Sequence, residues 1–470
     1  MNVSFLQELL NTIAEQGRQL LPRSLGGPGR ESDIAELAEA LSSNRGEASG
    51  VAIASELLRR YRSLTPETRL DFLKFLSRTM QPDPAELARA ATAYLSGPET
   101  TTLRALQRAV ESPRLEFFRR LNLAPGATAE IVSMRRDLIA TGDPSLAPLD
   151  GDLRHLLASW FNRGFLVLRR IDWHTPAVIL EKIIAYEAVH EIQGWDDLRR
   201  RLDPDDRSCF AFFHPSLIDE PLIFVEVALM DDIPASIGEV LQEAPKNGEV
   251  VRKPSTAVFY SISNCQEGLR GISFGNFLIK QVVEDLLKER PSLKTFVTLS
   301  PVPNFTAWLD AALAGADALR LVTPDERQRL TVLADPDWPS SGALAASLQP
   351  IMLRLAGHYF LAEKARDGRP LDPVARFHLG NGARLERINW LGDTSPKGLG
   401  EAHGLMVNYR YEIRDIEKNH EAYANAGAVA ASRQVHGLLK RPKRRAEPNK
   451  LLQIARLRPA KRGADQPEGP

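Results

Sequence analysis

The most constraining feature of this sequence is a glycine-rich loop between a buried strand and an amphipathic helix. The pattern predicts the strand at 257–263, the helix at 277–287 and a second strand at 295–300. Three glycines in the loop let the backbone turn tightly and approach a ligand closely. Because the loop ends where the helix begins, free N–H groups and the positive end of the helix dipole favour a phosphate there. The unit therefore predicts a domain that mixes strands and helices around an anion-binding loop.

The loop does not fit two common phosphate-binding motifs. It has neither the Gly-Lys-Ser/Thr of a P-loop nor the G-x-G-x-x-G of a dinucleotide fold. Arg270 adds a full positive charge, and the stretch Arg-x-x-Ser-x-Gly runs from Arg270 to Gly275. It resembles the loop that binds the pyrophosphate of coenzyme A in the GNAT acetyltransferase superfamily, with Ser273 in place of the middle glycine. Alone, the loop fits both a coenzyme A site and a simple glycine-rich turn.

The first third of the chain reads as helices throughout. Apolar residues recur at helical spacing, and Thr65-Pro66 and Asp83-Pro84 have the form of an N-cap followed by proline at the first helical position. The helical pattern breaks at 140–151, where glycine and proline indicate a loop. We therefore predict an all-helical N-terminal domain that serves packing or oligomerisation rather than catalysis.

The remaining chain changes character at its first convincing strand. Besides those around the loop, strands are predicted at 165–171, 209–214, 222–230, 385–391 and 405–411. A turn predicted at 219–221 would join the strands at 209–214 and 222–230 into a hairpin. Residues 301–370 read as mostly helical, and 373–413 as strand and loop.

These patterns predict an α+β chain with three parts. They are a helical domain at 1–155, a mixed-sheet catalytic domain with helical insertions at 156–437, and a basic tail at 438–470. The tail contains Lys-Arg-Pro-Lys-Arg-Arg and reads as solvated disorder more readily than as a nucleic-acid-binding segment.

Composition narrows the choice of partners and compartment. Sixty basic residues balance sixty acidic ones, so the chain has no global attraction to nucleic acid or to an anionic membrane. No apolar run approaches the ~20 residues that span a bilayer. Cys209 and Cys265 form no disulfide framework, and the acids in residues 1–21 argue against a transit peptide. We expect a cytoplasmic protein with no nucleic-acid or membrane partner.

Longer blocks in the second half resemble one known family. They are Phe-Tyr-Ser-Ile-Ser at 259–263, Leu-Ser-Pro-Val-Pro-Asn-Phe at 299–305, Pro-Val-Ala-Arg-Phe-His-Leu-Gly-Asn-Gly-Ala at 373–383, Arg-Ile-Asn-Trp-Leu-Gly-Asp at 387–393 and Gly-Leu-Met-Val-Asn-Tyr-Arg-Tyr at 404–411. In this order they resemble malonyl-CoA decarboxylases, from about residue 187 to 411.

The resemblance implies a fold, a reaction and a site. It implies a helical domain on a GNAT-like catalytic domain, and a homo-oligomer, dimer or tetramer, assembled through the helical part. Malonyl-CoA would be the substrate and acetyl-CoA the product, with no cofactor, because coenzyme A is part of the substrate. The catalytic pair would be Ser300 and His378. The substrate-binding loop would be Arg270, Gly271, Ile272, Ser273, Phe274, Gly275 and Asn276.

The chemistry suits this pair. Loss of carbon dioxide from a malonyl thioester leaves an enolate, and an acid must then protonate the α-carbon. We expect Ser300 to orient the carboxylate and accept a proton, and His378 to donate the proton, since histidine titrates near neutral pH. Without the resemblance, Ser300 would be read as a turn residue and His378 as a structural histidine.

Two further residues are secondary candidates. Ser261 lies on the strand beside the loop, and Tyr411 could hydrogen-bond to His378; both could equally be scaffold. The resemblance implies an acid at the position of Ser273 in many members, and this chain has a serine there instead. The histidines at 190, 214, 358 and 403 lack metal-ligand spacing, so we expect no metal site.

Two other classes of function stay open from sequence. The chain could be a GNAT-type acyltransferase that moves an acyl group to an amine or a carrier protein. It could also be a non-catalytic scaffold that senses coenzyme A.

Overall fold

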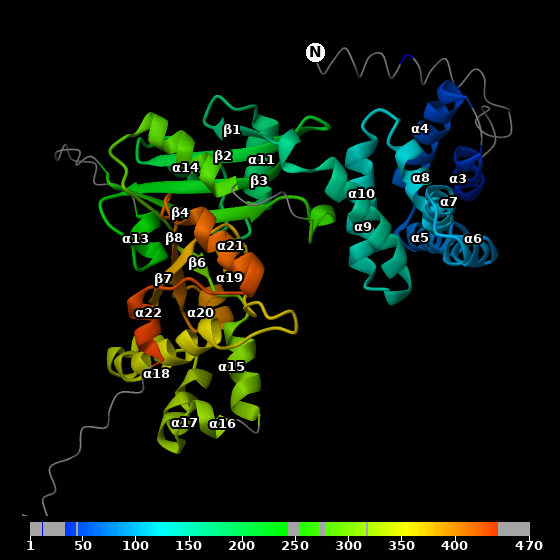
Figure 1. The fold of residues 1–470 in the computed structure, drawn as a ribbon. Helices are drawn as coiled ribbons and strands as arrows, with labels where there is room; N and C mark the ends of the chain where they lie inside the picture. Colours follow the sequence, from blue (N-terminus) through cyan, green and yellow to red (C-terminus); the bar gives the residue numbers. More distant parts are fainter. Residues whose placement is uncertain are drawn as a thin grey trace, which may run out of the picture.

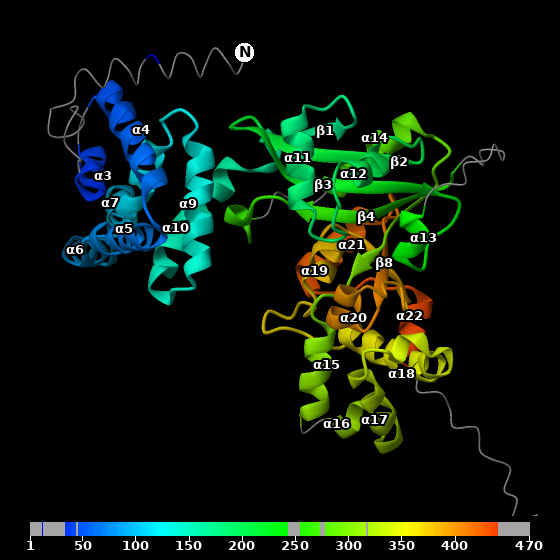
Figure 2. The same cartoon turned by 180° about the vertical axis from the view of Figure 1, so that it is seen from behind.

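The computed structural model describes residues 12, 33–43, 46–242, 254–272, 278–315 and 318–439. It has a helical domain to one side of a sheet domain, and the helices of the helical domain that lie nearest to the sheet domain are α9 (Ala127–Thr141) and α10 (Ala147–Trp160) (Figures 1 and 2). The predicted tail lies outside the described residues from 440 on. The α+β class is confirmed, with helices first and a mixed sheet after them.

The N-terminal domain is helical, as predicted. Its elements are α3 (Ile34–Ser42), α4 (Glu47–Ser63), α5 (Pro66–Thr79), α6 (Pro84–Ser96), α7 (Thr100–Val110), α8 (Pro113–Leu121), α9 (Ala127–Thr141), the 3-10 turn η1 (Pro144–Leu146) and α10 (Ala147–Trp160). The predicted starts of α5 and α6 are confirmed, because Thr65 and Asp83 accept hydrogen bonds from the first turns.

One boundary in this domain was predicted wrongly. The expected loop at 140–151 ends early, because α10 already begins at Ala147. Pro148 lies in the first turn of α10, where a missing N–H costs nothing. The predicted domain boundary at 155/156 therefore lies within α10, which leads through the 3-10 turn η2 (Arg163–Phe165) into the first strand, β1 (Val167–Ile171).

The sheet has eight strands among the described residues, in the order β1-β2-β3-β4-β5-β8-β6, with β7 also paired to β8. They are β1 (Val167–Ile171), β2 (Arg207–His214), β3 (Leu217–Met230), β4 (Thr256–Asn264), β5 (Thr295–Thr298), β6 (Ser300–Pro301), β7 (Arg384–Asn389) and β8 (Met406–Arg410). Neighbours are antiparallel except β4 and β5, which are parallel and joined through the glycine-rich loop and α14 (Leu278–Glu289). This confirms the predicted strand–loop–helix–strand unit.

The hairpin of β2 and β3 is confirmed, but its turn is not where we predicted it. The chain turns at Pro215 and Ser216, and residues 219–221 already belong to β3. Asp219 has a φ of 53° and the register shifts opposite Phe213, so this part of the ladder is irregular. A bulged ladder tolerates the proline and the left-handed residue that resembled a turn in the sequence.

Helices cover both faces of the sheet. Helices α11 (Ala177–Tyr186) and α12 (Trp195–Leu202) bury their apolar residues against one face of β2 and β3. Helix α14 lies in the apolar cluster on the other face, which also holds Phe259 of β4. A strand buried on both faces has few polar positions, so the polar side chains that do occur there stand out.

The last third of the described chain surrounds β7 and β8. The remaining helices of the sheet domain, two of them earlier in the chain, are α13 (Ile237–Leu241), α15 (Phe305–Ala314), α16 (Ala318–Leu321), α17 (Pro324–Leu330), α18 (Gly342–Leu361), α19 (Pro373–Gly380), α20 (Pro396–Ala402), α21 (Ile416–Ala426) and α22 (Arg433–Leu438), with 3-10 turns η3 (Glu267–Leu269), η4 (Thr331–Ala334) and η5 (Trp338–Ser340).

The expectation of only strand and loop at 373–413 was wrong. The segment contains α19 and α20 as well as the two predicted strands. Asp372 accepts a hydrogen bond from the N–H of Ala375 at 2.7 Å, and proline follows it at the first helical position. This is the same start signal as in α5 and α6. It places His378 in the last turn of a helix.

Candidate active site

The strand predicted at 295–300 is divided in two, and Ser300 lies just after the division. The N–H of Leu299 still donates to the carbonyl of Phe259 in β4, at 3.0 Å. Ser300 then pairs with Val407 of β8. Because Val297 already pairs with Arg410 of β8, the chain loses β4 as a neighbour after Leu299 and keeps β8. The change leaves the Ser300 hydroxyl free to face another element.

That element is α19, which brings the predicted catalytic pair together. Ser300 Oγ lies 3.2 Å from Nε2 of His378, and Nδ1 of His378 lies 2.9 Å from the hydroxyl of Tyr411. Ser300 Oγ also donates to Thr298 Oγ1 at 2.9 Å. All four side chains are buried, with no more than 5% of any residue exposed. Three segments far apart in sequence therefore form one continuous chain of hydrogen bonds.

The protonation state of this chain follows from burial. Desolvation lowers the pKa of His378 from 6.5 to about 3, so the ring is neutral at physiological pH. The expected near-neutral titration was wrong for this reason. Burial also raises the pKa of Tyr411, so the phenol keeps its proton.

The hydrogen-bond partners then assign the tautomer of the neutral ring. Among the described residues, the Tyr411 hydroxyl has one partner, Nδ1 of His378, so its proton is satisfied only by donation to Nδ1. The ring hydrogen is then on Nε2 and points to Ser300 Oγ, whose own hydrogen goes to Thr298. Both hydrogens are thus donated within the chain in this structure, and an anionic group could accept one of them only after that hydrogen turns away from its present partner.

A second set of contacts fixes these side chains in place. The ring of Tyr409 stacks on His378 with 4.6 Å between centroids and 24° between planes. The backbone N–H of Tyr409 donates to Thr298 Oγ1 at 3.1 Å, and Asn408 donates to the Thr298 carbonyl at 2.8 Å. Asn389 donates in turn to Asn408 at 2.8 Å. Such packing holds reactive groups to a single geometry.

Sequence reasoning missed Thr298 and Tyr409. Both precede a predicted site residue by two positions on a strand, Ser300 in one case and Tyr411 in the other. Residues two apart on a strand share one face. This spacing could have placed Thr298 beside Ser300 and Tyr409 beside Tyr411 from the sequence alone.

The secondary candidate Ser261 belongs to a different buried polar cluster. Its hydroxyl donates to Glu187 Oε2 at 2.6 Å and lies 3.2 Å from Ser263 Oγ. Glu187 Oε1 in turn accepts from two backbone N–H groups. The structure does not bring Ser261 into the hydrogen-bond chain of His378, whereas it does bring Tyr411 there.

The predicted phosphate loop is described only in its first part. Arg270 and Gly271 are exposed, and Ile272 is buried. Gly271 has a φ of 77°, a left-handed conformation that glycine adopts without strain. The predicted residues Ser273, Phe274, Gly275 and Asn276 lie outside the described residues.

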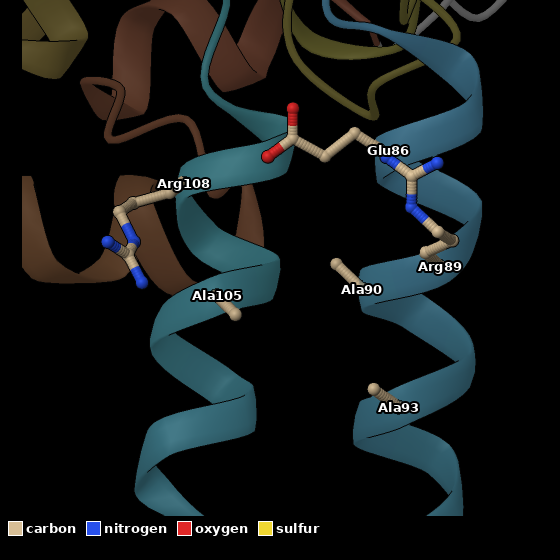
Figure 3. A pocket seen from close by; sticks show the side chains of 6 residues that line it. All are labelled: Glu86, Arg89, Ala90, Ala93, Ala105 and Arg108. Carbon is tan, nitrogen blue, oxygen red and sulfur yellow. The ribbon is translucent and has the colours of Figure 1, made fainter.

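A hollow on the helical domain, between α6 and α7, has different chemistry (Figure 3). Alanines from both helices face each other there, with a glutamate and two arginines around them. It is lined by Glu86, Arg89, Ala90, Ala93, Ala105 and Arg108. None of these residues is a histidine, serine or cysteine. The buried chain around His378 is therefore the better candidate for catalysis.

Family models match both parts of the chain. The model described as malonyl-CoA decarboxylase C-terminal domain matches residues 164–449, and the corresponding N-terminal domain model matches 80–161. The chain belongs to the malonyl-CoA decarboxylase family. Membership makes it an enzyme of the carboxy-lyase class and confirms the resemblance seen in the sequence blocks.

Curated and solved members of the family cover most of the chain. Malonyl-CoA decarboxylase, mitochondrial, of Anser anser anser is 37% identical over 415 residues, 81% of this chain and 82% of the relative. The solved malonyl-CoA decarboxylase of Rhodopseudomonas palustris is 53% identical with a TM-score of 0.82, and covers 86% of this chain and 98% of its own. That of Agrobacterium vitis is 54% identical with the same TM-score, covering 87% and 100%.

Compartment and assembly stay predictions. The goose and Rattus norvegicus relatives are named mitochondrial, so the cytoplasmic expectation for this chain is untested. Within the described residues, no helix combines the length and apolarity needed to cross a bilayer. The expected dimer or tetramer through the helical domain is likewise untested.

Proposed function

We propose that this chain converts malonyl-CoA to acetyl-CoA and carbon dioxide. The bond between the α-carbon and the carboxylate breaks, and its electron pair moves into the thioester to give an enolate. The enolate α-carbon then takes one proton, which completes acetyl-CoA. The observation that carries the proposal is the buried chain of Thr298, Ser300, His378 and Tyr411 in a member of this family.

In this mechanism Ser300 orients the carboxylate and His378 donates the proton. The hydroxyl of Ser300 turns from Thr298 to the substrate, and in the resting site its oxygen accepts from Nε2 of His378. A neutral imidazole N–H is a weak acid, but the α-carbon of a thioester enolate is a far stronger base. Tyr411, which donates to Nδ1, stabilises the ring as the Nε2 proton leaves.

We propose that the loop from Arg270 to Asn276 binds the phosphates of coenzyme A. The support is the exposed charge of Arg270 and the left-handed Gly271 at the start of the loop. No cofactor is required in this scheme, because the thioester itself accepts the electron pair. Stabilisation of the oxyanion by fixed hydrogen-bond donors supplies the rate enhancement.

The direct test is incubation of purified protein with malonyl-CoA and no acyl acceptor. We expect acetyl-CoA and carbon dioxide in equal amounts. Turnover only after addition of an amine or carrier protein would instead identify an acyltransferase. Binding of malonyl-CoA without any product would identify a coenzyme A-sensing scaffold.

Variants separate catalysis from binding. Ser300→Ala and His378→Ala should each lower kcat severely, by roughly 100-fold or more, in folded protein. Arg270→Ala should raise KM more than it lowers kcat, because phosphate contacts act equally on substrate and transition state. Near-parental rates in both Ser300→Ala and His378→Ala would refute the assigned roles.

A further inference from the structure

The helical domain contacts the start of the phosphate loop through one buried arginine. Arg135 of α9 donates to the carbonyls of Gly268 and Arg270, at 2.6 and 3.0 Å. Its Nε donates to Asp150 of α10 at 2.8 Å, and its side chain is only 2% exposed. One planar guanidinium therefore joins two helices of the helical domain to the turn that leads into the loop.

At Gly268 the backbone of the sheet domain lies directly against the backbone of α9 in the helical domain. A Cβ on Gly268 would lie 1.9 Å from the carbonyl oxygen of Val132 in α9, so only glycine fits. Leu269 and Ile272 are buried in the same apolar cluster as Ile131 and Val132. The first turn of the loop is thus packed on α9 and is not suspended in solvent.

A second arginine of the helical domain, Arg154, lies beside the start of the loop. Arg154 of α10 is exposed, and its Nη2 lies 3.5 Å from the carbonyl oxygen of Gly271. A Cβ on Gly271 would lie 3.8 Å from the same nitrogen. Within the described ranges no carboxylate forms an ion pair with Arg154, in contrast to the Arg135–Asp150 pair.

We propose that the helical domain forms one wall of the coenzyme A phosphate site. In this arrangement Arg154 binds a phosphate group of the ligand, and Arg135 is a positioning residue that fixes the turn beneath it. The inference rests on the proposed function, because it takes the ligand to be the coenzyme A part of the substrate. The exposed guanidinium of Arg154 beside the exposed Arg270 and the left-handed Gly271 brings two positive charges to one turn, which favours a phosphate group there.

The test measures coenzyme A binding by the full chain, which needs no turnover. Arg154→Ala should raise the Kd of coenzyme A about tenfold, the loss of one charge-assisted hydrogen bond. Titration with 3′-dephospho-coenzyme A distinguishes the phosphates. The tenfold effect disappears if Arg154 binds the 3′-phosphate and persists if it binds the pyrophosphate.

Arg135→Lys tests the positioning role. A lysine keeps the charge but cannot reach Asp150 and both carbonyls at once, so we expect a higher KM for malonyl-CoA with a smaller change in kcat. The matched control is Arg136→Ala, which removes an exposed arginine one residue along α9 whose hydrogen bonds among the described residues go to Ser133 and Asp137 of the same helix. This control should bind coenzyme A as the parent does.

The outcomes separate this inference from the proposed function. Parental Kd and KM values in both Arg154→Ala and Arg135→Lys would overturn the inference, whatever the parent catalyses. A parent that binds coenzyme A, loses affinity on Arg154→Ala and yet releases no carbon dioxide would overturn the decarboxylase proposal alone. Arg154 is exposed, so its variant should fold even if Arg135→Lys does not.

Discussion

Replacing Tyr411 with phenylalanine tests the geometry of the candidate site most directly. The substitution removes one hydroxyl, whose partner is Nδ1 of His378 at 2.9 Å. The ring itself remains, and with it the edge-on contact to Phe259 at 6.3 Å between centroids. The change therefore affects the histidine while leaving the packing around it in place.

The size of the effect follows from burial. His378 is 2% exposed, so Nδ1 loses its donor where little water can replace it. An unsatisfied buried polar atom costs about 1–3 kcal/mol. Without the Tyr411 hydroxyl, the His378 ring can also carry its hydrogen on Nδ1, and Nε2 then has no hydrogen to donate to Ser300. At 1.4 kcal/mol per tenfold change, kcat should fall about 5-fold to 150-fold. KM should change little, because the hydroxyl that is removed bonds, among the described residues, only to Nδ1 of His378.

The assay is steady-state release of carbon dioxide from malonyl-CoA, with acetyl-CoA measured in parallel. Tyr423→Phe is the matched control, because Tyr423 is also buried and its hydroxyl has no hydrogen-bond partner among the described residues. We expect this control to keep the parental kcat. A parental kcat in Tyr411→Phe, or an equal loss in both variants, would refute the idea that the Tyr411 hydroxyl sets the state of His378.

Three further predictions concern stability. Arg201→Met should lower the free energy of unfolding by about 3 kcal/mol in urea titrations, because fully buried Glu226 loses its partner at 3.1 Å; an unchanged midpoint would contradict this. Burial lowers the pKa of His378 to about 3, so the folded state binds its proton less readily than the unfolded chain does. The contribution of His378 to the free energy of unfolding is therefore complete above pH 6.5 and is lost as the pH falls towards 3, at about 1.4 kcal/mol per pH unit. His378→Gln should flatten the pH dependence of unfolding below pH 6.5 by that slope, and an unaltered slope would count against a neutral ring. Gly268→Ala should lower the free energy of unfolding by about 1–3 kcal/mol in thermal or urea melts, because the added Cβ would overlap the carbonyl of Val132. An unchanged melt would show that α9 can move to make room for the Cβ.

Local patterns were enough to predict the elements that frame the site. The glycine-rich unit has strong apolar strands on both sides, and β4, α14 and β5 all occur close to their predicted positions. The start of α19 could also have been predicted, because Asp372-Pro373 repeats the signal that identified α5 and α6. It was missed because the strands on either side of 373–383 dominated the interpretation of that region.

What sequence could not supply is the environment of the candidate catalytic histidine. His378 is separated from Ser300 by 78 residues and from Tyr411 by 33, so their contact depends on how β8 and α19 pack. The histidine pKa then follows from burial by that packing, not from any neighbour in the chain. The contact of Arg135 with Gly268 joins residues 133 positions apart in two domains, so no local sequence pattern predicts it.

The lowered pKa of His378 is consistent with the reaction proposed for the site. A charged imidazolium beside Ser300 would form an ion pair with the malonyl carboxylate, and would stabilise the substrate at the very group that must lose its charge. Catalysis gains only from interactions that are stronger in the transition state than in the bound substrate. A neutral ring avoids that ground-state stabilisation while keeping a hydrogen on Nε2 for the α-carbon. In the proposed reaction burial would therefore favour decarboxylation twice: it weakens the hold on the carboxylate and, with the Tyr411 hydrogen bond to Nδ1, keeps the proton on Nε2, beside Ser300.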